Sequence, residues 1–171
     1  MRNPTIVLEI LSEKSDDSSY KYKRLYRNLY NREFYCQAYL NIHANKGSMT
    51  PGSDNETIDG MSLKRMDNII ASMKDHSYQP EPARRTYIPR KDGKLRPLGI
   101  QSADDKLVQE VVRMILEAMY EPTSSENSHG FRPEKSCHTA LSQIQNSFTG
   151  VRWFVEGDIE KCFDSFDTMC W

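Results

Sequence analysis

The stretch RRTYIPRKDGKLRPLGI, residues 84–100, decides how the rest of this sequence is read. Two short runs suited to β-strands flank Asp92-Gly93, a dipeptide typical of hairpin turns. The stretch holds six Lys or Arg residues and a single acid. Pro89 and Pro97 cannot donate hydrogen bonds to a neighbouring strand, so both strands are expected at an edge or in a projecting pair. The sequence therefore predicts a basic β-hairpin that projects from a body and can close over an anionic ligand.

Helical periodicity surrounds the hairpin on both sides. We expect helices over residues 20–45, 61–78 and 102–120, and a further helix that ends at Gly150. Ser62 is the expected cap of the second helix, and Ser102 and Asp105 begin the third at the spacing of a capping box. The side chains expected to face the core are Ile69, Ile70, Met73, Leu107, Val108, Val111, Val112, Met114, Ile115, Ala118 and Met119.

The net charge of −1 hides an asymmetry along the chain. Residues 1–100 carry 17 Lys and Arg against 12 Asp and Glu, and residues 101–171 carry 6 against 12. Such halves suit polyanion binding at one end and cation binding at the other. In the basic half, residues 20–45 hold six tyrosines, which at helical spacing are typical of a core stripe, and cations that suit a phosphate backbone.

A cluster of carboxylates follows Val151–Val155, a run typical of a buried strand. It includes Glu156, Asp158, Asp164 and Asp167. Carboxylates at the end of a strand can hold Mg²⁺, because a hard divalent ion prefers oxygen ligands on a rigid support. An acidic run alone is more often a solvated turn, but the cationic hairpin, which could take a triphosphate, favours a metal site here.

Several motifs, in one order, resemble the fingers and upper palm of the reverse transcriptases that group II introns encode. The resemblance covers nearly the whole chain from about Lys21. The matching stretches are TPGSD at 50–54, RRTYIPRKDGKLRPLGI at 84–100, DKLVQEVVRMILEAMYEP at 105–122, SHGFRP at 128–133, SCHTAL at 136–141 and VEGDIEKCFD at 155–164.

This resemblance implies roles for five residues at a polymerase site. Asp158 corresponds to the first metal-binding aspartate of the family, and the backbone carbonyl of Ile159 would help to hold the second of two Mg²⁺ ions. Arg90 and Arg96 correspond to the finger cations on the incoming triphosphate. Phe163 corresponds to the aromatic residue beneath the incoming sugar that excludes a 2′-hydroxyl. The family often has Lys where Arg90 stands, and Arg keeps the charge while adding a fork of donors.

The resemblance also implies contacts with RNA, because the N-terminal extension of this family binds the host intron RNA. The partners implied are group II intron RNA, an RNA template with a DNA primer, and deoxynucleoside triphosphates, and a homodimer stays open. The expected RNA-binding residues are Lys21, Lys23, Arg24, Arg27, Lys91 and Lys94.

The sequence departs from the family pattern in two places. Glu160-Lys161 stands where the family has Lys-Gly, which adds a negative charge near the metal ions. The aromatic-Ala-Asp-Asp box, which supplies the other two metal-binding aspartates, does not occur in the 171 residues. We therefore expect a fragment of a longer protein that binds no Mg²⁺ stably and incorporates no nucleotide by itself.

The expected fold class is α+β: a reverse-transcriptase fingers and palm fragment with a helical N-terminal extension, a small antiparallel finger sheet and an incomplete palm. We expect the RNA-binding extension over residues 1–48, the fingers with supporting helices over 49–150, and the start of the palm over 151–171. The expected function of the full-length protein is RNA-directed DNA synthesis and, as a maturase, splicing of a group II intron. A non-catalytic RNA-binding module and a reverse transcriptase of the retron or diversity-generating type are the alternatives.

The triphosphate role favours one register of the hairpin. A two-residue turn would pair Arg90 with Leu95 and send Arg90 and Arg96 to opposite faces. A three-residue loop over residues 92–94 would set Arg90 directly opposite Arg96, and this is the register we expect.

Composition excludes a membrane protein, because the chain is 27% charged and has no apolar stretch near the roughly 18–20 residues that a span needs. The N-terminus carries acids and lacks a small-residue cleavage site, so it is not a signal peptide. The four cysteines form no C-x-x-C pair, and His129 and His138 stand at no zinc-binding spacing. We expect a reduced, cytoplasmic protein.

Overall fold

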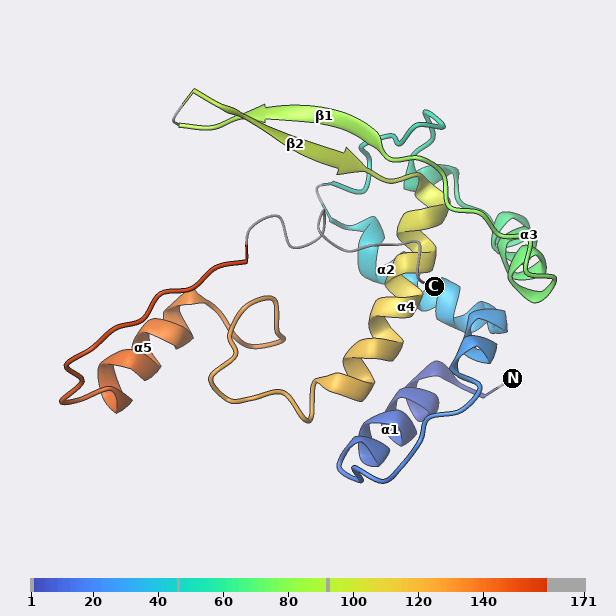
Figure 1. The fold of residues 1–171 in the computed structure, drawn as a ribbon. Helices are drawn as coiled ribbons and strands as arrows, with labels where there is room; N and C mark the ends of the chain where they lie inside the picture. Colours follow the sequence, from blue (N-terminus) through green and yellow to red (C-terminus); the bar gives the residue numbers. More distant parts are fainter. Residues whose placement is uncertain (1, 46, 92, 160–171) are drawn as a thin grey trace. The chain divides into compact units, whose positions relative to one another are not determined.

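The computed structural model describes residues 2–45, 47–91 and 93–159 of the chain. They form two compact units, Met1–Ser124 and Ser125–Trp171. Helices and a two-stranded antiparallel sheet make up the structure, which confirms the α+β class (Figure 1). The elements are α1 (Pro4–Ser15), η1 (Leu25–Tyr30), α2 (Arg32–His43), η2 (Ile58–Gly60), α3 (Leu63–Lys74), β1 (Arg84–Pro89), β2 (Leu95–Ile100), α4 (Ala103–Tyr120) and α5 (Cys137–Ser147), where η marks a 3₁₀ helix.

The core of the first unit forms around α4, against which α1 and α2 pack, while α3 contacts η1 and α2 (Figure 1). Among the described residues, fourteen buried apolar side chains fill this space, and each of the larger aliphatic ones contributes roughly 1.5–3 kcal/mol by leaving water. They are Leu29, Phe34, Tyr35, Ala38, Met66, Ile69, Ile70, Met73, Leu107, Val108, Val111, Met114, Ile115 and Met119.

The helices α3 and α4 begin where the sequence predicts. The Ser62 hydroxyl accepts a hydrogen bond from the Arg65 amide at 3.2 Å, and the Ser102 hydroxyl accepts one from the Asp105 amide at 3.1 Å. Each bond satisfies an amide that the first helical turn leaves without a partner. The expected burial of Val112 is wrong: it lies one step around α4 from Val111, at the edge of the apolar stripe, and is exposed.

The single helix expected over residues 20–45 is wrong. The chain is irregular up to Arg24, whose φ of 59° is left-handed, and continues as the short η1. Asn31 then breaks the helical path in an extended conformation and caps α2, accepting a hydrogen bond from the Glu33 amide at 3.2 Å. Its side-chain amide also donates to the carbonyl of Arg2 at 2.9 Å, a contact that a continuous helix would lose.

Helix α1 does not follow from the apolar patch at the N-terminus, and sequence reasoning missed it. The signal was Asn3-Pro4, since Asn is a favoured cap and Pro is favoured at the first helical position. The Asn3 side chain accepts a hydrogen bond from the Thr5 amide at 2.9 Å. The segment that follows α1 folds back onto it, because the Tyr22 hydroxyl donates to the carbonyl of Leu11 at 2.9 Å.

In the second unit, α5 begins at a capping box made by Ser136 and Thr139. The preceding loop is tied to α5 by His129, whose ring nitrogens lie 2.9 Å from the Thr139 hydroxyl and 2.6 Å from the Gln143 amide oxygen. The buried strand expected over Val151–Val155 is wrong, because these residues are exposed and in no strand. The described part of the second unit contains no strand with which they could pair. No described helix is long and apolar enough to cross a membrane.

Candidate functional site

The hairpin forms as predicted, but its register differs from the expected one. The Arg90 amide donates to the carbonyl of Lys94 at 2.8 Å, and Ile88 is the partner of Arg96. The expected pairing of Arg90 with Arg96 is therefore wrong, and so is the alternative pairing with Leu95. The loop comprises residues 91–93 and has Gly93 at its third position with a φ of 78°. This left-handed third residue is typical of three-residue hairpin loops, and Gly adopts it without strain.

The two prolines explain why this register suits the sequence. Antiparallel partners alternate between pairs that exchange backbone hydrogen bonds and pairs that do not. Counting from the hydrogen-bonded pair of Arg90 and Lys94, both Pro89 and Pro97 fall in pairs that exchange none. Neither proline therefore stands at a position where the sheet needs a backbone amide donor.

The observed register keeps the cations expected at a triphosphate on one face of the hairpin. Opposite partners in an antiparallel sheet project from the same side, as do residues two apart on one strand. Arg90 and Arg96 therefore share a face, with Arg96 diagonal to Arg90 instead of opposite it, and Lys94, one of the residues expected to bind RNA, lies on the same face. All three residues are exposed. Diagonal neighbours lie about 7–8 Å apart at the backbone, within reach of long side chains that converge on one polyanion.

The base of the hairpin is fastened to the loop of residues 48–57 and to the start of α4. The Arg84 guanidinium donates to the carbonyl of Pro51 at 2.9 and 3.1 Å, and the Lys106 ammonium donates to the carbonyl of Thr50 at 2.7 Å. Gly52 lies against the backbone of Ser102 at the junction of β2 and α4. These contacts tie the loop of residues 48–57 to the start of β1 and to the junction of β2 with α4.

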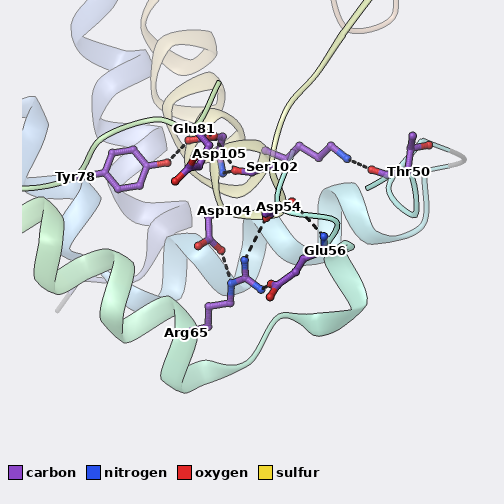
Figure 2. Close-up of polar contacts among 10 residues, drawn as sticks. Thr50, Asp54, Glu56, Arg65, Tyr78, Glu81, Ser102, Asp104 and Asp105 are labelled. Atoms are coloured by element: carbon purple, nitrogen blue, oxygen red, sulfur yellow. Dashed lines mark hydrogen bonds and ion pairs between the residues drawn. The ribbon is translucent and has the colours of Figure 1, made fainter. Parts of the chain in front are cut away.

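Arg65, on α3, joins three acids from two other segments (Figure 2). Its side chain is 22% exposed; Nε lies 2.5 Å from a carboxylate oxygen of Asp104, one terminal nitrogen lies 3.7 Å from Asp54, and the other pairs with Glu56. Without Arg65 the three carboxylates would face one another with no cation between them and would repel one another. Arg65 therefore holds the loop of residues 48–57 against the first turn of α4.

Asp105 anchors the chain that leads into β1. Its buried carboxylate accepts hydrogen bonds from the Tyr78 hydroxyl, from the Glu81 amide at 3.0 Å and from the Ser102 hydroxyl at 2.7 Å (Figure 2). Burial raises the pKa of Tyr78 well above its ordinary value, and the hydrogen bond to Asp105 raises it further. Tyr78 therefore stays a neutral donor at any physiological pH. We call this cluster the hairpin clamp. It consists of Arg65 with Asp54, Glu56 and Asp104, and of Asp105 with Tyr78, Glu81 and Ser102.

The structure places the predicted N-terminal cations on one short segment, outside the α-helix expected for them. Lys21 and Lys23 lie in irregular chain, Arg24 precedes η1 and Arg27 lies within it. All four are exposed, and none of their side chains has a hydrogen bond or ion pair with another described residue. Tyr26 fastens the segment to the end of α3, because its hydroxyl donates to the carbonyl of Met73 at 3.1 Å.

The tyrosines of residues 20–45 divide between the core and the surface. Tyr35 is fully buried, and its hydroxyl donates to the carbonyl of Leu29 at 2.9 Å. Tyr20 and Tyr26 are exposed, and the Tyr26 ring stacks on that of His76 with centroids 5.4 Å apart. The expectation of a core stripe therefore holds for only part of the set, because the helix that would align these residues is broken at Asn31.

The predicted metal residues lie in the second unit. Asp158 is exposed, and its carboxylate accepts a hydrogen bond from the amide of Ile159 at 2.9 Å. Phe163 lies outside the described residues. Within residues 2–45, 47–91 and 93–159, no three His, Cys, Asp or Glu side chains gather as metal ligands would. The described residues by themselves do not form a two-metal site.

Sequence reasoning missed the hairpin clamp. Asp105 appeared only as a helix cap, and its distance of 24 residues from Glu81 gave no sign that they meet. Arg65 gave no signal, since it reads as a solvated cation on the polar side of α3. The Gly and Pro of TPGSD at 50–54 pointed to a loop but not to the backbone on which that loop packs.

Comparison with known proteins identifies the class. Residues 88–168 match the family described as reverse transcriptase (RNA-dependent DNA polymerase). The match covers 81 of the 171 residues and confirms the resemblance to reverse transcriptases that the hairpin and the motif order predicted. The chain is also similar to a protein encoded by a group II intron, which confirms the predicted resemblance to that type.

Two relatives define this likeness. The chain is 48% identical over 169 residues to the group II intron-encoded protein LtrA of Lactococcus lactis subsp. cremoris, an alignment that covers 98% of the chain and 28% of that protein. It is 45% identical over 163 residues to an uncharacterized 91 kDa protein in the cob intron of Schizosaccharomyces pombe, covering 92% of the chain and 20% of that protein. The chain thus spans less than a third of the length of these relatives.

A third relative carries the maturase name. Over 63 residues the chain is 43% identical to nuclear intron maturase 1, mitochondrial, of Arabidopsis thaliana, which covers 37% of the chain and 9% of that protein. The names of these three relatives all refer to introns, which favours the intron type over the retron or diversity-generating type.

Proposed function

We propose that the chain forms the fingers and the first part of the palm of an RNA-directed DNA polymerase that also acts as the maturase of a group II intron. The observation that carries this proposal is the exposed cationic face of the hairpin, Arg90, Lys94 and Arg96, in a chain aligned over 98% of its length with a group II intron-encoded protein. Residues 1–48 would be the RNA-binding extension, residues 49–150 the fingers with their supporting helices, and residues 151–171 the start of the palm.

The hairpin residues suit the binding of a deoxynucleoside triphosphate. Arg guanidinium groups present several donors in a fixed fork that matches phosphate oxygens, and Lys adds a compact charge. Three cations on one face can neutralise most of the charge of a triphosphate and hold its reacting phosphorus in place. The hairpin clamp ties the chain that leads into β1 to the start of α4.

Magnesium is the cofactor we propose for the full-length protein, where Asp158 and the carbonyl of Ile159 would hold it and it would supply charge neutralisation at the transferred phosphate. Phe163 would select deoxyribose. The template with its primer would be the second substrate. The protein would act in the reduced cytoplasm, in keeping with Cys36 and Cys137, which are free thiols.

RNA binding by Lys21, Lys23, Arg24 and Arg27 tests the maturase part of the proposal. A filter-binding titration of a group II intron transcript at several salt concentrations would measure both the affinity and its salt dependence. Charge reversal of Lys23, Arg24 and Arg27 to Glu should weaken binding, and each lost phosphate contact should reduce the salt slope by about one. Lys64→Glu, an exposed cation on α3, is the matched control and should bind like the wild type. Unchanged affinity in the triple variant would show that these cations are solvated surface residues that do not contact the RNA.

Primer extension tests the polymerase part. The 171-residue chain should incorporate no nucleotide on a primed RNA template, because the described residues supply one carboxylate of the family's set. Incorporation by this chain alone would contradict our assignment of the missing aspartates. A non-catalytic RNA-binding module is the remaining alternative, and a longer form of the protein that binds the intron transcript but extends no primer would favour it.

A further inference from the structure

A cavity of about 430 Å³ lies in the first unit between the end of α2, η2 and the middle of α4. Its volume falls within the roughly 300–1,000 Å³ of pockets that hold small molecules. None of the residues that line it belongs to the hairpin or to the hairpin clamp, and none has a part in the triphosphate, metal or RNA contacts proposed above. The polymerase and maturase roles therefore leave this cavity unused.

Part of the cavity wall is apolar. Ile42, on α2, is half-buried, and Ile58, in η2, is fully buried. Gly47 also lines the cavity and adds no side chain, and a β-carbon built there would meet no atom within 4 Å. Water against such a wall lacks hydrogen-bonding partners, so a ligand with an apolar body gains free energy by taking its place.

Lys106 brings a positive charge to the cavity from α4. Its half-buried ammonium donates to the carbonyl of Thr50 at 2.7 Å, and it forms no ion pair with a described carboxylate. An ammonium has three donors, so two of them remain for a ligand. Burial lowers the pKa of Lys106, and the weaker attraction of Asp54 does not offset it. The charge of Lys106 is therefore incompletely compensated within the described part of the chain.

The other charged residues of the cavity compensate one another. The Glu110 carboxylate accepts hydrogen bonds from Arg113 at 2.7 and 2.8 Å, and Arg113 also pairs with Glu117 at 2.6 Å. Gln109 is neutral and exposed, and its side-chain amide has no hydrogen bond with another described residue. The cavity thus offers a ligand one positive charge at Lys106, an amide at Gln109 and an apolar wall.

We propose that this cavity binds a small organic anion, whose apolar body lies against Ile42 and Ile58 and whose carboxylate or phosphate group pairs with Lys106. The site stands apart from the proposed function, since it needs neither nucleic acid nor a triphosphate. Lys106 also holds the loop of residues 48–57 through Thr50, so a bound anion contacts the residue that ties this loop to α4.

Probes that share one apolar body and differ in their polar group provide the test. Naphthoate carries a carboxylate, naphthyl phosphate carries a phosphate, and naphthol is uncharged at neutral pH. Each is titrated into the 171-residue chain with isotope-labelled isoleucine methyl groups, observed by nuclear magnetic resonance. The signals of Ile42 and Ile58 should shift and saturate with naphthoate, naphthyl phosphate or both. Ile70, which is buried in the core and does not line the cavity, is the internal control.

The charge of Lys106 should decide the affinity. Naphthol should bind about 10- to 150-fold more weakly than the anions, the range expected for the loss of a hydrogen bond with a charged group. Lys106→Met keeps an apolar chain and removes the charge, so it should bind the anions as weakly as the wild type binds naphthol, whereas Lys106→Arg should keep the affinity. Lys64→Met, at an exposed cation on α3, is the matched control and should bind like the wild type. Thermal unfolding of each variant shows whether the fold is kept.

The outcomes separate the two sources of the anion. Saturation with naphthoate alone assigns the site to a carboxylate, saturation with naphthyl phosphate alone assigns it to a phosphate, and saturation with both shows that charge suffices. The proposal is overturned if neither anion saturates the shifts, if naphthol binds as tightly as the anions, or if Ile70 shifts as much as Ile42 and Ile58. If Lys106→Met does not fold, the comparison of naphthol with the anions on the wild type decides the question.

Discussion

Gly52 lies so close to Ser102 that a β-carbon built on Gly52 would stand 2.6 Å from the α-carbon of Ser102. The atoms that it would meet are backbone atoms at the start of α4, which cannot turn aside as a flexible side chain could. The loop of residues 48–57 therefore reaches the base of the hairpin only because residue 52 has no side chain.

Gly52→Ala should destabilise the first unit by about 1–3 kcal/mol, the usual cost of overpacking a close contact. Urea unfolding followed by circular dichroism would measure it. Gly47→Ala is the control: no atom lies within 4 Å of a β-carbon there, and a change within about 0.5 kcal/mol is expected. Equal effects at the two glycines would contradict the close approach of the loop to α4.

Asp105 and Tyr78 should be energetically coupled. Asp105→Ala leaves the Tyr78 hydroxyl and the Glu81 amide without their acceptor, and Tyr78→Phe removes one donor while keeping the ring. A double-mutant cycle measured by urea unfolding should give a coupling free energy of about 0.5–3 kcal/mol, as for residues in one hydrogen-bonded network. Additive effects would show that the two side chains do not meet in solution.

Arg65 should contribute more to the free energy of unfolding than an exposed cation that forms a single ion pair. Arg65→Ala leaves three carboxylates facing one another and should destabilise the first unit by about 1–3 kcal/mol. Arg32→Ala breaks a pair with Asp67 in which both side chains are about half exposed, and it should cost less than about 1 kcal/mol. Amide hydrogen exchange of residues 84–100 should be faster in Arg65→Ala than in the wild type and unchanged in Arg32→Ala. Equal exchange rates in the two variants would show that Arg65 does not help to hold the hairpin.

Glu110 should make stability depend on pH. Its side chain is 9% exposed. The carboxylate accepts hydrogen bonds from the Arg113 guanidinium at 2.7 and 2.8 Å and from the Asn41 side-chain amide at 2.9 Å. Burial would raise the pKa of Glu110, but the hydrogen bonds from Arg113 and Asn41 outweigh it and lower the pKa below the ordinary 4.5. A lowered pKa in the folded state stabilises the fold above the ordinary value, and this contribution is lost as the pH falls through the folded pKa.

The free energy of unfolding should therefore fall below pH 4.5 partly through Glu110. Glu110→Gln should show a weaker fall over this range, whereas Gln in place of the exposed Glu13 should leave the profile as it is. Parallel profiles for the wild type and Glu110→Gln would show that the hydrogen bonds from Arg113 and Asn41 do not hold the charge.

The hairpin register predicts particular contacts in solution. Partners that exchange no hydrogen bonds bring their α-carbons to about 4.5 Å, so their α-protons should give strong cross-strand nuclear Overhauser effects. These effects are expected between Tyr87 and Pro97 and between Pro89 and Leu95. A strong effect between the α-protons of Arg90 and Arg96 instead would restore the register in which these two residues face each other.

The sequence by itself determined the elements that local chemistry decides. Ser62 and Ser102 mark the starts of α3 and α4 because a hydroxyl at a cap bonds an amide only three residues away. The alternation and turn residues of 84–100 likewise define a hairpin without help from the rest of the chain. The order of the motifs was enough to predict the resemblance to reverse transcriptases that the comparisons confirm.

Only the tertiary structure decided the features that depend on distant residues. The register follows from Gly93 in a left-handed conformation and from two prolines that must both avoid hydrogen-bonded pairs, a condition on both strands at once. The break at Asn31 follows from its bond to Arg2, 29 residues away, and the clamp follows from Arg65 meeting Asp104, 39 residues away. Such contacts carry no local sequence signal, because the chain forms them only once a shared core has brought the segments together.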